Sequence, residues 1–214
     1  HHRRSGKFIE KTVLNYTEAY ASSTCELITE LLQYLDEKEN MNETEANALM
    51  AGMCMDTKMF TFKTGVRTFE AASYLRRKGA DTIIAKTMLQ DDLATYATRS
   101  EAVRNAKIYF DSIAISQLEN ESEYAKIIAA QAADELLNIK GINASFIILK
   151  SGSGLVISGR SMGEVNVQLI LEKMGGGGHL AIAGAQLPDI NDLDVGKQML
   201  LSAIEEYMKE REEK

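Results

Sequence analysis

The chain has 214 residues, of which 45% are hydrophobic and 26% are charged, and its formal net charge is -7. This length and apolar content can supply the core of one large domain or two small ones. The negative charge argues against binding along a long nucleic acid, which normally needs a basic face. No apolar run approaches the roughly 18 to 20 residues of a bilayer span, so the sequence itself shows no membrane contact and no signal peptide.

Helix signals dominate the first half of the sequence. Asn42 and Glu45 have the spacing of a capping box, and apolar residues at helical spacing follow them. One helix is predicted to end at Gly79 and another to begin at Asp81. We therefore expect a helical stretch from about residue 43 to residue 107.

Strand and helix signals alternate in the second half. Residues 108–116 are β-like, and residues 122–138 predict a helix. Residues 143–150 and 155–161 predict two strands that a glycine turn joins. A short helix then leads to four glycines, and an amphipathic helix ends the sequence. The predicted fold class is α/β, with a mostly helical part followed by a smaller α/β part.

The least usual stretch is the run Gly175 to Gly178, which His179 follows directly. Each glycine costs roughly 0.5 to 1 kcal/mol relative to alanine in regular structure, so four in a row need a reason. A backbone without Cβ atoms can point successive N–H groups at a phosphate; the alternative is a flexible connector. Arg160, Ser161 and His179 together favour the phosphate site, because arginine and histidine side chains can donate to phosphate oxygens.

Asp56 ends the best-capped predicted helix, where a carboxylate faces the negative end of the helix macrodipole. One interpretation is a turn-forming aspartate before Thr57. The other is a metal ligand, since a divalent cation would outweigh the unfavourable dipole. Both interpretations stay open at this point.

The two cysteines indicate a reducing compartment rather than a redox or metal site. Cys25 and Cys54 form neither a CxxC pair nor a zinc-ligand spacing. Two buried thiols in a reducing, cytoplasmic environment are the simplest interpretation.

In combination, these motifs resemble those of a known family. GGGGH, with SGRS before it and AIAGAQL behind it, resembles the DHH-associated domain of DHH-family phosphoesterases. HHRRSGKF and AGMCMDTKMFTFKTG look like the second half of the DHH domain itself. Within that family, the chain resembles the GdpP-type cyclic-di-AMP phosphodiesterases over essentially its whole length. The resemblance implies the helical remainder of a DHH domain in residues 1–118 and a substrate-binding DHH-associated domain with a mixed sheet in residues 119–214.

The resemblance also implies roles for single residues. His1 and Asp56 correspond to manganese ligands, and His2 corresponds to a catalytic histidine that faces the scissile phosphate. Ser22 and Ser23 match a family stretch near the substrate, without an assigned role. Contacts to the nucleotide and its phosphate are implied for Arg160, Ser161, Gly175, Gly176, Gly177, Gly178 and His179.

The implied activity is hydrolysis with two manganese ions, which would activate a water for in-line attack on phosphorus. Cyclic di-AMP would open to linear pApA. Two alternatives remain: a phosphoesterase of the same family that acts on oligoribonucleotides or pAp, and a nucleotide-binding module without turnover. The expected partners are a cyclic or short linear dinucleotide and, in a homodimer, a second copy of the chain.

The sequence departs from the family pattern at its start. In the family, an aspartate precedes the two histidines, and a preceding lobe carries further metal ligands. We therefore expect the chain to be the C-terminal portion of a longer enzyme, anchored in a membrane through upstream segments. The alternative is that the two histidines are the remnant of an affinity tag.

Overall fold

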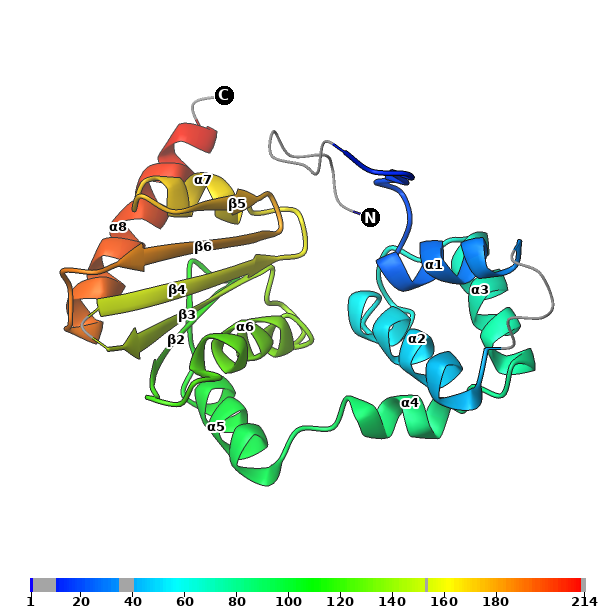
Figure 1. Cartoon of the computed structure of the whole chain (residues 1–214). Coiled ribbons are helices and arrows are strands. Elements are labelled where there is room, and N and C mark those ends of the chain that lie inside the picture. The colour runs from blue at the N-terminus through cyan, green and yellow to red at the C-terminus, as the bar shows by residue number, and fades with distance from the viewer. Residues whose placement is uncertain (2–10, 35–40, 153, 213–214) are drawn as a thin grey trace. The chain divides into compact units, whose positions relative to one another are not determined.

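The computed structural model describes residues 1, 11–34, 41–152 and 154–212. The chain divides into two compact units, His1–Gln90 and Asp91–Lys214, and each is described by itself (Figure 1). None of the helices in the described ranges combines the length and apolar character that a membrane crossing would need.

The first unit is built from helices. They are α1 (Thr24–Leu32), α2 (Glu43–Asp56), α3 (Val66–Arg77) and α4 (Thr82–Met88). The predicted capping box at the start of α2 is confirmed: the Asn42 side chain accepts from the Glu45 N–H at 3.0 Å, and the Glu45 carboxylate accepts from the Asn42 N–H at 2.9 Å. Met50, Met53 and Leu75 are the largest fully buried side chains of the core, and alanines fill most of the rest.

The second unit has a mixed sheet, as the α/β prediction requires. The elements are α5 (Leu93–Arg104), β1 (Lys107–Tyr109), β2 (Ile113–Glu119), α6 (Ala125–Leu136), β3 (Ala144–Ser151), β4 (Gly154–Ser161), α7 (Val167–Glu172), β5 (Gly177–His179), β6 (Ile182–Leu187) and α8 (Leu193–Glu212). The strand order is β1-β2-β3-β4-β6-β5. Among the strands that the structure describes, only β2 and β3 pair in parallel, and α6 makes the crossover that a parallel pair needs.

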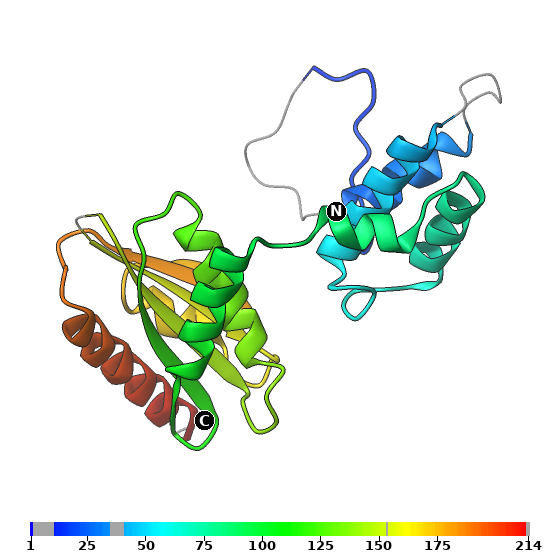
Figure 2. The same ribbon diagram turned by 90° about the horizontal axis from the view of Figure 1, so that it is seen from below.

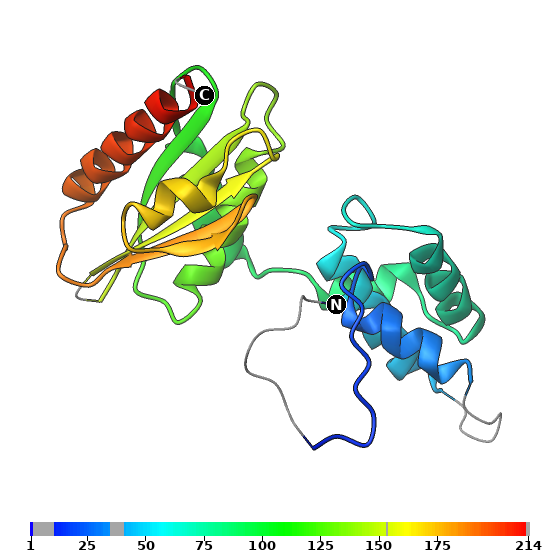
Figure 3. The ribbon, with the colours of Figure 1, turned by 90° about the horizontal axis from the view of Figure 1, so that it is seen from above.

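Helices cover the two faces of this sheet unequally. Figures 2 and 3 show α8 on one side of the sheet and α5 and α6 on the other. Along β3, Phe146 and Ile148 pack in the core that α7 and α8 cover, whereas Ile147 and Leu149 pack in the core that α5 and α6 cover. This alternation follows from the two-residue period of a strand. On the α6 side, residues of β6 stay exposed, so one part of the sheet face is open.

The division predicted after residue 118 falls within β2, inside the second unit. Pairing of β2 with β3 runs from Ile113 to Glu119 and joins this strand to the rest of the sheet. The buried Ser116 hydroxyl donates to the Ala102 carbonyl of α5 at 2.6 Å, which holds that helix against β2. Long-range pairing of this kind leaves no local mark in the sequence.

Candidate functional site

The two predicted metal ligands, His1 and Asp56, lie against each other in the first unit. The Nδ1 atom of His1 is 3.3 Å from the Oδ2 atom of Asp56, although the residues stand far apart in the sequence. The His1 side chain is 12% exposed and that of Asp56 is 40% exposed, so solvent still reaches the carboxylate. His2, the predicted catalytic histidine, lies outside the described residues.

The geometry of this pair is compatible with shared binding of one divalent ion. Two ligand atoms that are each about 2.1 Å from an ion in octahedral geometry lie about 3 Å from each other. Imidazole nitrogens and carboxylate oxygens are both common metal ligands. Within the residues that the structure describes, no cluster of three or more His, Cys, Asp or Glu side chains forms a metal site. His1 and Asp56 therefore offer two of the several donors that an ion needs.

The backbone directly after Asp56 has an unusual conformation. Lys58, Met59 and Phe60 have φ angles of 46°, 56° and 63°, which place three consecutive non-glycine residues in the left-handed region. Such backbone costs roughly 1 to 2 kcal/mol per residue. Strain of this kind persists only where surrounding contacts determine it, and it is concentrated at functional sites.

Thr57 supplies most of the contacts that hold this left-handed turn. It is fully buried, and its Oγ1 donates to the Met53 carbonyl at 2.6 Å and accepts from the Phe60 N–H at 2.9 Å. The Thr57 carbonyl accepts from the N–H groups of Thr61 and Phe62, both at 2.8 Å. Thr57 thereby ties the turn to the end of α2, the helix that carries the predicted metal ligand.

The four glycines of the second unit do not share one role. Gly175 has a φ of 75°, its N–H donates to the Glu172 carbonyl at 3.0 Å, and the Gly176 N–H donates to the Leu171 carbonyl at 2.8 Å. This pair of bonds is a Schellman motif, which ends α7. A Cβ atom on Gly176 would lie 2.7 Å from the Cβ of Ala185 and would also collide with the β6 backbone. Helix termination and packing explain these two glycines.

Gly177 differs from its neighbours. A Cβ atom on Gly178 would lie 2.5 Å from the Cα of Ala183, so packing against β6 excludes a side chain there. A Cβ atom on Gly177 would meet nothing within 4 Å, and its φ is not positive. Neither packing within the described residues nor backbone conformation requires glycine at position 177. A ligand that approaches the backbone closely is a physical reason for glycine at position 177.

Strand register brings Arg160 and His179 to one face of the sheet. Arg160 of β4 pairs with Ile182 of β6, and Ile182 pairs with His179 of β5. Directly opposite residues point to the same face, so these three side chains form a row, the Arg160 row. Because neighbouring strands are about 4.8 Å apart, the Cα atoms of Arg160 and His179 are about 10 Å apart. Ile182, between them, is 54% exposed.

Ser161 occupies the opposite face, because neighbouring residues of a strand point to opposite sides. It is buried, its Oγ accepts from the Gly163 N–H at 2.9 Å, and its N–H donates to the Ala181 carbonyl at 2.9 Å. In this structure, Ser161 shapes the turn after β4. Of the two predicted residues of β4, Arg160 alone shares a face with His179.

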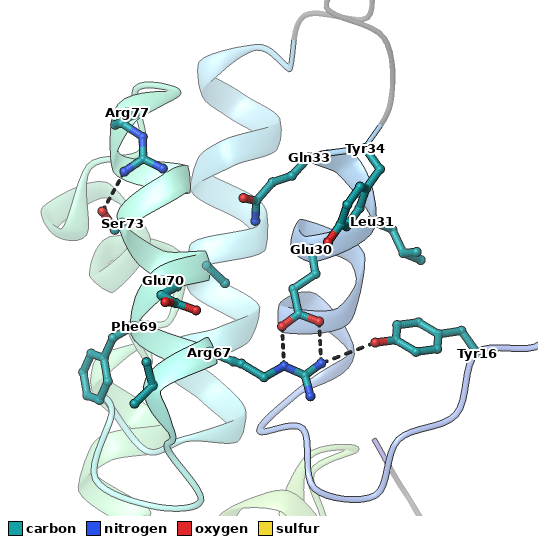
Figure 4. Close-up of a pocket in the computed structure, with 12 residues that line it drawn as sticks. Tyr16, Glu30, Leu31, Gln33, Tyr34, Arg67, Phe69, Glu70, Ser73 and Arg77 are labelled. Carbon is teal, nitrogen blue, oxygen red and sulfur yellow. Dashed lines mark hydrogen bonds and ion pairs between the residues drawn. The ribbon is translucent and has the colours of Figure 1, made fainter.

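Arg67, which the sequence reasoning did not single out, organises the segment before α1. Its Nε and Nη2 atoms donate to the Glu30 carboxylate at 2.7 and 2.6 Å, and Nη2 also donates to the Tyr16 hydroxyl (Figure 4). Arg67 donates to the Glu18 carboxylate as well. The bonds to Glu30 and Glu18 raise the pKa of Arg67, and the bond from Arg67 lowers the pKa of Glu18.

Arg67 lines a cavity of about 910 Å³ between α1 and α3, together with Phe69 and Tyr34 (Figure 4). The cavity is nevertheless a poor anion site, because two carboxylates, Glu18 and Glu30, already bind the guanidinium. Sequence spacing held no signal for this cluster, since its members come from three separate segments.

The two serines near the start of α1 have structural partners. Ser23 is the N-cap of α1, and its Oγ accepts from the Glu26 N–H at 3.0 Å. The Ser22 hydroxyl donates to the Glu26 carboxylate, and the Thr68 hydroxyl donates to the same carboxylate at 2.6 Å. Glu26 is only 2% exposed, so this buried carboxylate joins α1 to α3. A serine followed three residues later by glutamate is a cap signal that sequence reasoning could have used.

Both cysteine thiols are free. Cys54 is buried in the core of the first unit and Cys25 is half-buried beside it. Burial raises the pKa of both thiols, which favours the unreactive protonated form. A role in packing accounts for both residues.

Two protein-family models match the chain. The DHHA1 domain matches residues 110–210, and the N-terminal domain of the DHH family matches residues 1–53. The first match covers strands β2 to β6, which include the glycine strand, and the second covers His1 and most of α2.

Curated relatives match almost the whole chain. The cyclic-di-AMP phosphodiesterase PdeA of Listeria monocytogenes serotype 1/2a (strain 10403S) is 50% identical over 210 residues, which are 98% of this chain and 32% of that protein. The cyclic-di-AMP phosphodiesterase GdpP of Geobacillus thermodenitrificans (strain NG80-2) is 48% identical over 208 residues, which are 97% of this chain and 32% of that protein. The chain thus spans about a third of the length of these relatives.

A solved structure shares the fold. An exopolyphosphatase-related protein from Bacteroides fragilis superposes with a TM-score of 0.75 at 24% sequence identity, over 88% of this chain and 57% of that protein. At this identity the similarity establishes the arrangement of helices and strands alone.

Proposed function

The chain belongs to the DHH family, and we propose that it supplies part of the active site of a cyclic-di-AMP phosphodiesterase, an enzyme that opens the cyclic dinucleotide to linear pApA. In this proposal the first unit contributes metal ligands and the second unit binds the nucleotide. Identity to cyclic-di-AMP phosphodiesterases along almost the entire chain supports the substrate.

The observation that carries the binding role is Gly177. It alone among the four glycines has neither a positive φ nor a neighbour that excludes a Cβ atom. It lies in the edge strand β5, two residues before His179. Along an edge strand, some backbone N–H groups have no strand partner and can donate to a ligand. A phosphate that accepts from this backbone could also accept from His179 or Arg160.

His1 and Asp56 would hold a divalent ion, with manganese as the candidate, because their donor atoms are 3.3 Å apart and of suitable chemistry. When bound, a pair of such ions supplies an activated water and neutralises charge that develops on the phosphate. Thr57 and the left-handed turn fix the end of α2 and so keep the Asp56 carboxylate in place.

Calorimetric titration of the 214-residue chain with cyclic di-AMP tests the binding role. Gly177→Val should raise the Kd at least about tenfold, because the new side chain fills the approach to the strand, while the midpoint of thermal unfolding changes little. Gly65→Val is the control. A Cβ atom at this position would also meet nothing within 4 Å, but Gly65 belongs to the first unit. An unchanged Kd for Gly177→Val would contradict the proposal.

Titration with manganese tests the metal role independently of turnover. Asp56→Asn should weaken manganese binding, because a neutral amide is a poorer ligand than a carboxylate. Asp189→Asn, at an exposed aspartate of the second unit, is the control. Equal manganese affinity in both variants would remove Asp56 from the metal site.

The affinities of the chain for cyclic di-AMP and for pAp distinguish the proposed substrate from the alternative. Tighter binding of pAp than of cyclic di-AMP would favour the alternative phosphoesterase. Formation of pApA by this chain with manganese would exclude a module that only binds.

A further inference from the structure

Arg160 is held from the side of α6 by a carboxylate. Its Nε atom is 3.3 Å from Oδ1 of Asp134, and its Nη1 donates to the Gly159 carbonyl at 2.9 Å. The Arg160 side chain is 14% exposed and that of Asp134 is 30% exposed. The guanidinium thus lies at the border between α6 and the open part of the sheet face.

These contacts use only part of the guanidinium. An arginine side chain has five N–H donors in a fixed fork. Nε faces Asp134 and one Nη1 donor binds Gly159, and within the described residues no hydrogen bond of Nη2 is recorded. The two Nη2 donors therefore remain for a further partner.

We propose that Asp134 is a positioning residue, which orients the Arg160 guanidinium so that its remaining donors face the phosphate of a nucleotide on the Arg160 row. The inference rests on the proposed nucleotide-binding function. Asp134 itself need not touch the nucleotide. Its effect is to restrict a long side chain whose freedom would otherwise have to be lost on binding.

Glu135, the next residue on α6, also pairs with an arginine, but that arginine is not part of the proposed nucleotide site. Glu135 lies 2.9 Å from Nε of Arg99, so it forms an equivalent pair with α5. Arg99 is outside the Arg160 row and also pairs with Asp91 at the start of the second unit. The two adjacent carboxylates lie on the same helix and have the same chemistry, but they pair with different arginines. Glu135 therefore provides a matched control for Asp134.

The sign of the effect on binding separates positioning from simple electrostatics. Asp134→Asn removes a negative charge near an anion, and Coulomb attraction alone then predicts tighter binding. A positioning role predicts weaker binding, because the amide cannot form an ion pair with Arg160. The two explanations thus make opposite predictions for one variant.

The test is calorimetric titration of the 214-residue chain with cyclic di-AMP. Asp134→Asn should raise the Kd about fivefold to tenfold, and Glu135→Gln should leave it unchanged. In an Arg160→Ala background, Asp134→Asn should have no further effect, because there is no guanidinium left to orient. Thermal unfolding of the two single variants should be similar, since each variant removes a partly exposed ion pair with an arginine.

An unchanged or lower Kd for Asp134→Asn would overturn the inference, as would an equal loss with and without Arg160. Failure of the proposed function has a different signature. If Arg160→Ala and Gly177→Val both bind cyclic di-AMP as well as the unmodified chain, the nucleotide site itself is refuted.

Discussion

Two regions of the molecule depart from regular backbone next to a predicted ligand contact, and they do so in opposite ways. In the second unit, Gly175 to Gly178 adopt a helix stop and an edge strand in which glycine avoids both left-handed strain and steric conflict. In the first unit, Lys58, Met59 and Phe60 adopt left-handed φ angles although each has a side chain.

The difference shows two ways of fixing a functional backbone. The glycine segment costs conformational entropy but carries little strain, because glycine tolerates these conformations. The left-handed turn after Asp56 carries strain of roughly 1 to 2 kcal/mol per residue, which the hydrogen bonds of the buried Thr57 offset. The first solution is visible in the sequence as four glycines, and the second is not.

The largest expected effect is that of Gly176→Val. A side chain there collides with the β6 backbone and with Ala185, so the second unit should lose several kcal/mol of stability, at or above the usual range of about 1 to 3 kcal/mol for overpacking. Chemical denaturation measures the loss, and Gly177→Val is the matched control. Equal stability of the two variants would mean that the glycines are interchangeable.

Thr57→Val should have the next largest effect. Valine has nearly the same shape but leaves the Phe60 N–H and the Met53 carbonyl without their Oγ1 partner, which costs about 1 to 3 kcal/mol. Thr61→Val, at an exposed threonine of the same turn, should cost much less. A comparable loss in both variants, measured by denaturation, would show that Thr57 does not hold the turn.

Met59→Gly should act in the opposite direction. Glycine removes roughly 1 to 2 kcal/mol of left-handed strain and adds roughly 0.5 to 1 kcal/mol of entropy cost. Met59 is 51% exposed, so little burial is lost. The first unit should gain up to about 1.5 kcal/mol. Met55→Gly, within α2, should instead lose about 1 kcal/mol. Destabilisation by Met59→Gly would argue against strain.

The smallest expected effect is a loss of stability at low pH. The folded-state pKa of Glu18 lies below its usual value of 4.5, first because Arg67 donates to it. A lowered pKa stabilises the folded state above pH 4.5, and this contribution disappears as the pH falls through the lower folded-state pKa. The difference in thermal midpoint between the unmodified chain and Glu18→Gln should therefore shrink between pH 5 and pH 3. A difference independent of pH would exclude the ion pair as its cause.

Local signals predicted most elements of the fold. The capping box at Asn42, the helix start at Asp81 and the strand pair around Gly152 were readable because each depends on residues close together in the sequence. The position of β2 beside β3 was not readable, because this pairing joins residues that lie far apart in the sequence.

For the candidate site, too, some features could be predicted from the sequence and others depend on the tertiary structure. The sequence by itself determined the residue types: a histidine and an aspartate suited to a metal, and an arginine, glycines and a histidine suited to a phosphate. Tertiary structure alone decided that Asp134 pairs with Arg160, that Ser161 points away from the Arg160 row, and that among the four consecutive glycines only Gly177 is free of a structural requirement. The physical reason is that chemistry belongs to single side chains, whereas orientation depends on strand register and on contacts between residues distant in the sequence.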